Sequence, residues 1–209
     1  RTTPETVRVG GRLTVRPVTA ARWPELERFF GPSGAYSNCW CAFFRVPSKE
    51  FASGCRDKGA ANHELLRRLS LEGAVPGLLG YRDDEPAGWV SVAPREQFVR
   101  VTKSRLLQPP SPDAESESGV WSVVCFWVPR KNRGDGVGDA LLKGAVEYAF
   151  ANGARVVEGY PVDVSTKWVG AAGIYHGTVG QFERAGFVAV RRPSDQRAVM
   201  RYEQPRKSR

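Results

Sequence analysis

The sequence predicts an α/β (α+β) fold with a mixed, mostly antiparallel sheet flanked by helices. First, two apolar runs at 120–128 and 154–160 enclose an amphipathic stretch at 138–151. Such a strand–helix–strand unit joins parallel strands through a helical crossover. Second, paired short strands separated by turn residues lie on both sides of this unit and add antiparallel hairpins. Together these patterns place a parallel pair near the centre of the sheet.

The other elements follow from hydrophobic periodicity and from turn residues. In chain order the sequence predicts a strand at 12–18, a helix from Thr19 to 30, a helix at 62–71, a hairpin at 77–81 and 87–93, a helix at 95–107, a helix at 178–185 and a last hairpin at 187–191 and 198–202. The aromatic stretch 36–45 shows no clear period. The run at 120–128 is apolar almost throughout, which predicts a strand buried on both faces.

The chain of 209 residues fits one domain of generous size. We expect a single domain at 12–204 with tails at 1–11 and 205–209. The segment 108–119 is rich in Pro, Ser and Glu. This composition is typical of disorder and predicts a mobile surface loop within the domain.

The composition favours a globular protein with polyanionic partners. Hydrophobic residues make up 41% of the chain, and 31 basic against 22 acidic residues give a formal charge of +9. Both nucleic acid and a nucleotide-bearing cofactor are polyanions. The chain lacks a helix-turn-helix pattern or an aromatic-plus-basic RNA motif, so nucleic acid is not favoured. No apolar run approaches the ~18 residues of a membrane span and no signal-peptide pattern is present, which predicts a cytoplasmic protein.

Four cysteines, Cys39, Cys41, Cys55 and Cys125, raise the question of a metal site. The close pair Cys39-Trp40-Cys41 is spaced more tightly than the paired cysteines of zinc sites. Cys125 lies inside an apolar run, where a free thiol packs as a small hydrophobic side chain. We therefore expect free thiols and no metal.

A glycine-rich turn, Arg133-Gly134-Asp135-Gly136-Val137-Gly138, joins the apolar strand to the helix at 138–151. Glycines let backbone N–H groups converge, and a helix N-terminus adds partial positive charge, so the turn is suited to a pyrophosphate. Glu158 lies 20 residues after Gly138, where a Rossmann site would carry its ribose-binding acid. However, neither G-x-G-x-x-G nor the Walker sequence is met.

Arg133-x-x-Gly136-x-Gly138 resembles the signature of the GNAT N-acetyltransferase superfamily, and Phe182-Glu-Arg-Ala-Gly-Phe187 resembles its later helix and Gly-Phe segment. The resemblance implies a GNAT-like sheet of about seven strands whose central parallel pair splays apart to hold acyl-CoA. It also implies transfer of an acetyl group from acetyl-CoA to a primary amine of a small molecule or peptide by direct attack. A catalytically weak or inactive acyl-CoA-sensing protein of the same fold is the alternative.

The resemblance assigns the acyl-CoA site to ten residues in or after the apolar strand. They are Phe126, Trp127, Val128, Arg133, Gly134, Asp135, Gly136, Val137, Gly138 and Asp139. It implies that the backbone of Phe126 and Val128 pairs with the pantetheine arm, and that a bulge in the strand frees these groups. Asp135 departs from the family pattern, because a carboxylate beside a pyrophosphate is unfavourable unless it points to solvent.

Phe182 occupies the position where the family often has a Tyr acid, so the resemblance does not supply the acid. Glu158 is the candidate base, with an ion pair to an Arg as the structural alternative. His176 is the candidate acid, with a loop histidine of no role as its alternative. Tyr160 lies beside the expected reaction centre.

The aromatic stretch 39–45 falls where the family builds its acceptor pocket. Trp40, Phe43, Phe44 and Trp89 are therefore candidate substrate contacts for an aromatic or apolar acceptor, with core packing as the alternative. The expected partners are a coenzyme A thioester and an amine, without a membrane or nucleic acid, and a homodimer stays open.

Overall fold

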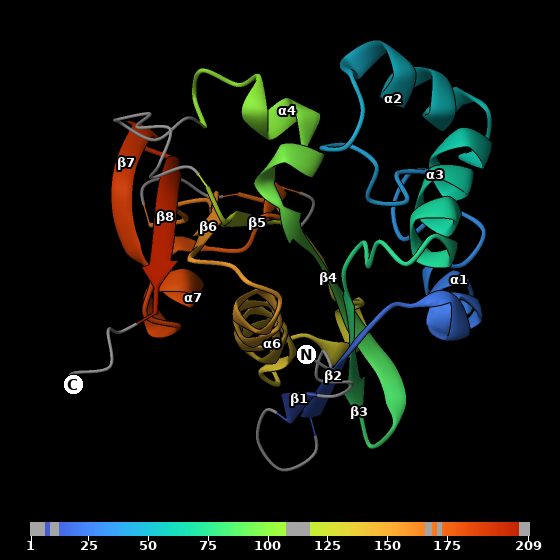
Figure 1. The fold of residues 1–209 in the computed structure, drawn as a ribbon, viewed down its shortest axis with the longest axis horizontal. Coiled ribbons are helices and arrows are strands. Elements are labelled where there is room, and N and C mark those ends of the chain that lie inside the picture. Colours follow the sequence, from blue (N-terminus) through green and yellow to red (C-terminus); the bar gives the residue numbers. More distant parts are fainter. Residues whose placement is uncertain (1–6, 9–12, 108–117, 166–168, 171–172, 205–209) are drawn as a thin grey trace.

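The computed structural model describes residues 7–8, 13–107, 118–165, 169–170 and 173–204. Its centre is an eight-stranded sheet in the order β1-β2-β3-β4-β5-β6-β8-β7 (Figure 1). The strands are β1 (Val7–Arg8), β2 (Leu13–Pro17), β3 (Leu78–Arg82), β4 (Glu85–Pro94), β5 (Val120–Trp127), β6 (Val156–Gly159), β7 (Val188–Ser194) and β8 (Arg197–Glu203). The helices are α1 (Trp23–Phe30), α2 (Ser48–Arg56), α3 (Ala60–Leu71), α4 (Val99–Thr102), α6 (Val137–Ala151) and α7 (Val179–Arg184), with 3-10 turns η1 (Ala20–Arg22), η2 (Arg95–Gln97) and η3 (Arg130–Asn132).

The mixed, mostly antiparallel sheet predicted from the sequence is confirmed. Among the described strands, β5 and β6 form the parallel pair, joined by α6, and every other neighbouring pair is antiparallel. The strand beyond the expected seven is the two-residue β1, which lies in the stretch 1–11 that we expected to be a tail.

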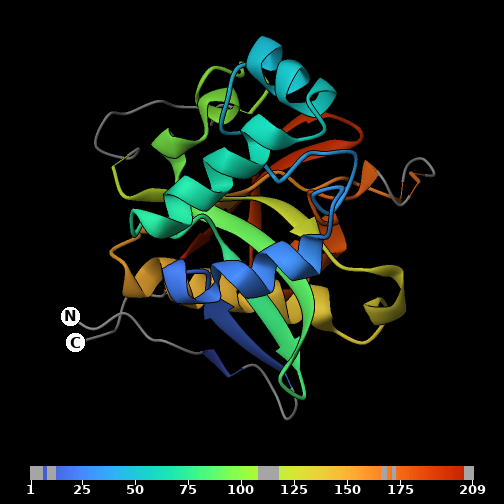
Figure 2. The ribbon, with the colours of Figure 1, turned by 90° about the vertical axis from the view of Figure 1, so that its right-hand side faces the viewer.

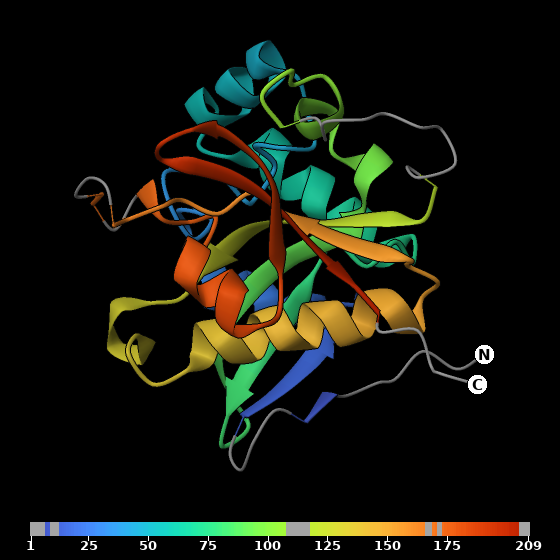
Figure 3. The same cartoon turned by 90° about the vertical axis from the view of Figure 1, so that its left-hand side faces the viewer.

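Helices cover both faces of the sheet. Figure 2 shows α1 and α3 in front of one face, and Figure 3 shows α6 and α7 in front of the other. Two glycines let α6 lie close to the sheet. A Cβ at Gly88 would stand 2.8 Å from Leu141, and one at Gly144 would stand 2.8 Å from Val15. Leu141 is fully buried at this contact, so the crossover helix is held tightly against β2 and β4.

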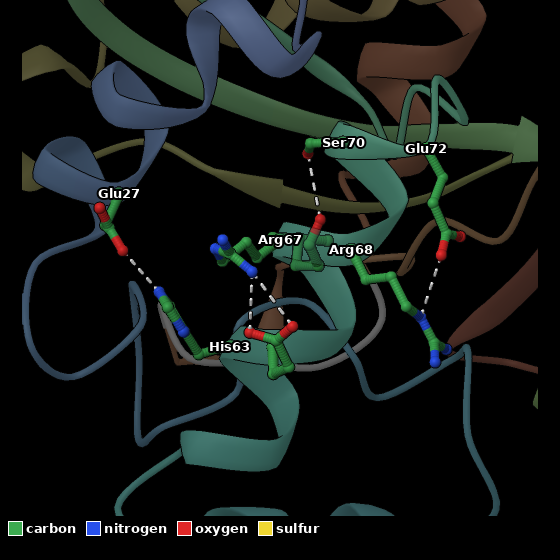
Figure 4. Close-up of polar contacts among 8 residues, drawn as sticks. Glu27, His63, Arg67, Arg68, Ser70 and Glu72 are labelled. Carbon is green, nitrogen blue, oxygen red and sulfur yellow. Dashed lines mark hydrogen bonds and ion pairs between the residues drawn. The ribbon is translucent and has the colours of Figure 1, made fainter.

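On the opposite face of the sheet from α6, polar contacts hold α1 and α3 together (Figure 4). His63 Nε2 on α3 lies 2.6 Å from Glu27 Oε1 on α1, and the His63 ring packs edge-on against Trp40 with centroids 4.4 Å apart. Arg67 pairs with Glu64 along the exposed side of α3. The contacts between α1 and α3 fix the layer that carries the loop 31–47.

The structure differs from the sequence predictions in two helical regions. Helix α2 was not predicted, because Ser48–Arg56 has few apolar residues from which a helical period could be recognised. The stretch 95–107, predicted as one helix, contains only η2 and the four-residue α4. Most of the predicted loop, 108–117, and the C-terminal tail at 205–209 lie outside the described residues. No helix in the described part of the chain has the length and apolar character needed to cross a membrane.

Candidate functional site

A cleft of about 1050 Å³ opens where β5 and β6 separate. Their parallel ladder runs from Val120 opposite Val156 to Val123 opposite Gly159. β6 ends at Gly159, whereas β5 continues to Trp127. The cleft is lined by the end of β5, the start of α6, part of the segment 174–184 and the region 34–55.

A β-bulge lies in β5 at the start of the cleft. Ser91 of β4 faces Cys125 and Val92 faces Val123, so Val124 is the extra residue. This confirms the bulge implied by the family resemblance. It turns the Val124 carbonyl toward His176, whose Nδ1–H donates to it over 3.0 Å.

Backbone groups at the end of β5 and just after it already have partners within the chain. The Phe126 N–H donates to the Tyr175 carbonyl over 2.6 Å, and the Val128 carbonyl accepts from Arg133 Nε over 2.8 Å. The resemblance assigned the backbone of Phe126 and Val128 to the pantetheine arm. A ligand that accepts from the Phe126 N–H must displace the Tyr175 carbonyl, whereas the Val128 carbonyl has a second lone pair for a ligand donor.

The glycine-rich turn closes the other end of the cleft. Gly134 and Gly136 have φ values of 88° and 78°, in the left-handed region that favours glycine. Gly136 is the N-cap of α6 and has no side-chain cap, so the first N–H groups of the helix lack a side-chain acceptor. Free backbone N–H groups at a helix N-terminus have the geometry and partial charge that suit an anion.

Comparison with known proteins now decides the family. The model of the Acetyltransferase (GNAT) family matches residues 40–175. The chain belongs to the GNAT acetyltransferase family. No curated protein matches the sequence significantly.

Solved structures share this GNAT fold over nearly the whole chain. The GNAT domain of PAT from S. lividans is 18% identical with a TM-score of 0.54, over 98% of this chain and 99% of that one. A putative GNAT acetyltransferase from Desulfovibrio desulfuricans is 19% identical with a TM-score of 0.50, over 91% and 98%. PaiA N-acetyltransferase from Thermoplasma acidophilum, solved in complex with coenzyme A, is 11% identical with a TM-score of 0.51, over 93% and 100%.

Nine of the ten residues that the GNAT resemblance assigned to the acyl-CoA site line the cleft. They are Phe126, Trp127, Val128, Arg133, Gly134, Gly136, Val137, Gly138 and Asp139. Asp135 is the exception, because its carboxylate turns away to Arg82, 2.9 Å distant. Asp139 pairs with Arg184 of α7 at 3.1 Å, so its negative charge faces a guanidinium.

The four predicted acceptor contacts divide into two groups. Phe43 and Phe44 line the cleft. Trp40 and Trp89 do not, since they are 5% and 0% exposed and pack in the core around Phe30, so the core-packing alternative holds for both.

The end of the cleft away from the turn is lined by residues of the region 34–55, Cys125 and Tyr175, and we call it the pocket end. It also contains residues that sequence reasoning missed. Tyr36 comes from the loop after α1, and Phe51 comes from the unpredicted helix α2. Glu50 in the first turn was an available helix-start signal for α2.

Glu158 and Tyr160 lie in a buried polar network outside the cleft. Glu158 is 0% exposed, with Oε2 2.8 Å from Arg201 Nε and Oε1 3.5 Å from Arg95 Nε. The Tyr160 hydroxyl donates to Glu158 Oε1 over 2.6 Å and lies 2.9 Å from the Ser122 hydroxyl. Burial and the Glu158 charge hold the pKa of Tyr160 well above its usual value. This is the ion-pair alternative, and we assign neither residue a catalytic contact.

His176 does not line the cleft, although its neighbour does. His176 is 4% exposed, and burial, with the nearby Arg197 charge, lowers its pKa to about 3. It is therefore a neutral imidazole fixed on the bulge. Its ring packs against Tyr175 with centroids 4.0 Å apart, and Tyr175 lines the cleft. Burial raises the pKa of Tyr175, which keeps the phenol protonated at neutral pH.

All four cysteines are free thiols and line the cleft. Cys41 Sγ lies 3.5 Å from Cys125 Sγ. Burial and the neighbouring Cys41 raise the pKa of Cys39 to about 12, so this thiol is a poor nucleophile. Within the described residues, no group of three or more His, Cys, Asp or Glu side chains could hold a metal ion.

Proposed function

We propose that the protein is an N-acetyltransferase that moves an acetyl group from acetyl-CoA to a primary amine of a small molecule or peptide. The observation that carries the proposal is a cleft that joins a backbone anion site, a bulged strand edge and an aromatic pocket. The coenzyme A complex of PaiA, which has a similar fold, supports a CoA thioester as the donor. The working unit would be the single domain at 12–204.

The pyrophosphate would bind at the turn end of the cleft. The N–H groups of Gly134, Gly136 and Gly138 stand at the positive end of α6 and need no side chain to bind an anion. Arg184 would add charge by leaving Asp139, because this exposed pair is held weakly.

The reaction joins the amine nitrogen to the thioester carbonyl carbon and breaks the carbon–sulfur bond. The nitrogen loses one proton and the leaving thiolate gains one. We assign the donor of the sulfur's proton to Tyr175, since its protonated phenol belongs to a residue that lines the cleft beside β5. The amine proton would return to the phenolate or pass to water. Phe182, at the usual acid position, has no proton to give.

Phe126 supplies a second feature of the proposed reaction. Its N–H faces the splayed region and is held by the Tyr175 carbonyl. When a thioester enters and that carbonyl moves, the N–H becomes a donor for the oxygen that gains charge during attack. This movement would also seat Tyr175 against the sulfur.

Two measurements on the purified protein test the proposal. Calorimetry with acetyl-CoA should show binding in the micromolar range or tighter, with desulfo-CoA and free adenosine as comparison ligands. Thiol release with a panel of amines should then exceed the amine-free rate. Absence of acetyl-CoA binding below millimolar concentration would rule the proposal out.

A CoA-sensing protein without turnover is the second candidate. Two observations favour it: Phe182 replaces the usual Tyr, and the Phe126 N–H is already bonded within the chain. Tight acetyl-CoA binding without thiol release for any amine would support the sensor over the enzyme.

A further inference from the structure

We infer that the acceptor is an aromatic amine that is uncharged at neutral pH, bound in the pocket end of the cleft. The inference rests on the proposed acetyl transfer and names its substrate class. It excludes polyamines and lysine side chains as preferred acceptors. Three features of the pocket support it: its lining, the arginines close to that lining and the position of Glu158.

The lining of the pocket end is aromatic, sulfur-containing or small. Its larger side chains are Tyr36, Phe43, Phe44, Phe51 and Tyr175, and the four cysteines also belong to the lining. Among the described residues that line the whole cleft, the one carboxylate is Asp139, which lies at the turn end. An ammonium moved from water into an apolar pocket without a counter-charge loses its hydration, whereas an aromatic ring gains by burial.

Two arginines lie close to residues that line the pocket end. Arg100 lies over the Phe43 ring, with Cζ 4.0 Å from the centroid, and its Cζ is 5.5 Å from the Phe51 centroid. Arg45 is buried below the Cys41 loop, and burial lowers its pKa to about 10. The Arg100 guanidinium already packs on the Phe43 ring, so this ring is poorly placed to bind a substrate ammonium. Like charges near the walls oppose a cationic acceptor further.

Glu158, on the parallel strand β6, does not line the pocket. Its carboxylate is fully buried and pairs with Arg95 and Arg201. No described carboxylate therefore stands in the pocket end to take a proton from an ammonium before attack. An arylamine needs no such step, because its nitrogen is neutral at pH 7 and carries its lone pair into the pocket.

A matched pair of acceptors tests the inference. Aniline and benzylamine carry the same ring and differ by one methylene, but only benzylamine is an ammonium at neutral pH. With saturating acetyl-CoA we expect kcat/KM for aniline to exceed that for benzylamine, spermidine and a lysine peptide by about tenfold or more. Raising the pH should narrow the gap for benzylamine, which separates charge from the effect of the methylene.

Two variants address the pocket itself. Ser37→Asp adds a carboxylate to a lining residue, where φ is 47° and Asp is tolerated, and it should lower the aniline-to-benzylamine ratio about tenfold. Ser33→Asp makes the same charge change outside the lining and should leave the ratio unchanged. Phe51→Ala should raise the KM for aniline, while Leu71→Ala, at an exposed position on α3, should not.

The outcomes separate this inference from the proposed function. A higher kcat/KM for spermidine or the lysine peptide than for aniline would overturn the inference and leave the acetyltransferase standing. Tighter binding of octanoyl-CoA than acetyl-CoA, weakened by Phe51→Ala, would assign the pocket to an acyl chain and also overturn it. Failure to bind acetyl-CoA at all would instead remove the proposed function.

Discussion

The two ends of the cleft are built from different parts of the polypeptide. The turn end uses neighbouring residues, 133–139, and offers backbone N–H groups at the start of α6. The pocket end gathers side chains from the region 34–55, from Cys125 on β5 and from Tyr175. A backbone site depends on local conformation, whereas a side-chain pocket depends on the packing of distant segments. On the proposed function, substitutions in the pocket end would change the acceptor without changing the backbone site for the donor.

The largest effect should come from neither end but from the buried network beneath them. Glu158→Gln removes the buried carboxylate charge that pairs with the guanidinium groups of Arg95 and Arg201. We expect a loss of about 3–5 kcal/mol in the free energy of unfolding. The matched Glu64→Gln, in an exposed pair on α3, should cost at most about 0.5 kcal/mol. Urea denaturation of both variants measures this. If Glu158→Gln abolished thiol release and left the stability unchanged, Glu158 would instead be the catalytic base.

The next effect concerns the junction of the two ends. Tyr175→Phe removes the proposed acid and should lower kcat about 100-fold, with acetyl-CoA affinity unchanged. Tyr202→Phe, on β8 and outside the cleft lining, is the control. Steady-state kinetics and calorimetry give the two quantities. Full kcat in Tyr175→Phe would show that another group protonates the sulfur.

His176 donates to the Val124 carbonyl of the bulge. Its lowered pKa predicts that the stability of the protein depends on pH. Its folded pKa of about 3 lies below its unfolded value of about 6.5, so the unfolded chain takes up a proton that the folded chain cannot. The contribution of the neutral ring is fully present above pH 6.5 and is lost as the pH falls toward 3. Between about pH 7.5 and about pH 5 the loss should reach roughly 2 kcal/mol. His176→Asn should remove this part of the pH dependence in urea titrations, and an identical pH profile would contradict the assignment.

The smallest effect tests the turn end with a matched glycine pair. Gly136 and Gly153 both have positive φ, 78° and 90°, and a Cβ at either would meet nothing within 4 Å. Replacing either by Ala should cost about 1 kcal/mol of stability. Only Gly136→Ala should weaken acetyl-CoA binding, by about tenfold, since only it alters the anion site. If calorimetry gave the two variants equal affinities for acetyl-CoA, the turn would not be the pyrophosphate site.

The sequence predicted the turn end well because its information is local. Gly134, Gly136 and Gly138 are adjacent in the chain, and the strand before them and helix after them are recognisable by period. The hairpins and the parallel pair were predictable for the same reason. The bulge at Val124 came from the family resemblance, since an apolar run of β5 gives no sign of an extra residue.

The rest could not be predicted because it depends on which segments meet. Glu158 lies on a strand buried on both faces, so alternation could not tell whether it faced the cleft. Its partner Arg201 stands directly opposite on β8, 43 residues later. Trp40 and Phe43 belong to one aromatic stretch, yet the first packs against Gly34 in the core and the second lines the cleft. Residue type alone does not separate these outcomes.

A crystal structure of the protein with coenzyme A tests the account most directly. It should show pyrophosphate oxygens within hydrogen-bond distance of the N–H groups of Gly134 to Gly138. The sulfur should lie near the Tyr175 hydroxyl, the Tyr175 carbonyl should have released the Phe126 N–H, and the aromatic pocket should remain open beyond the sulfur. A pyrophosphate bound away from the turn, or a sulfur in contact with Glu158, would contradict it.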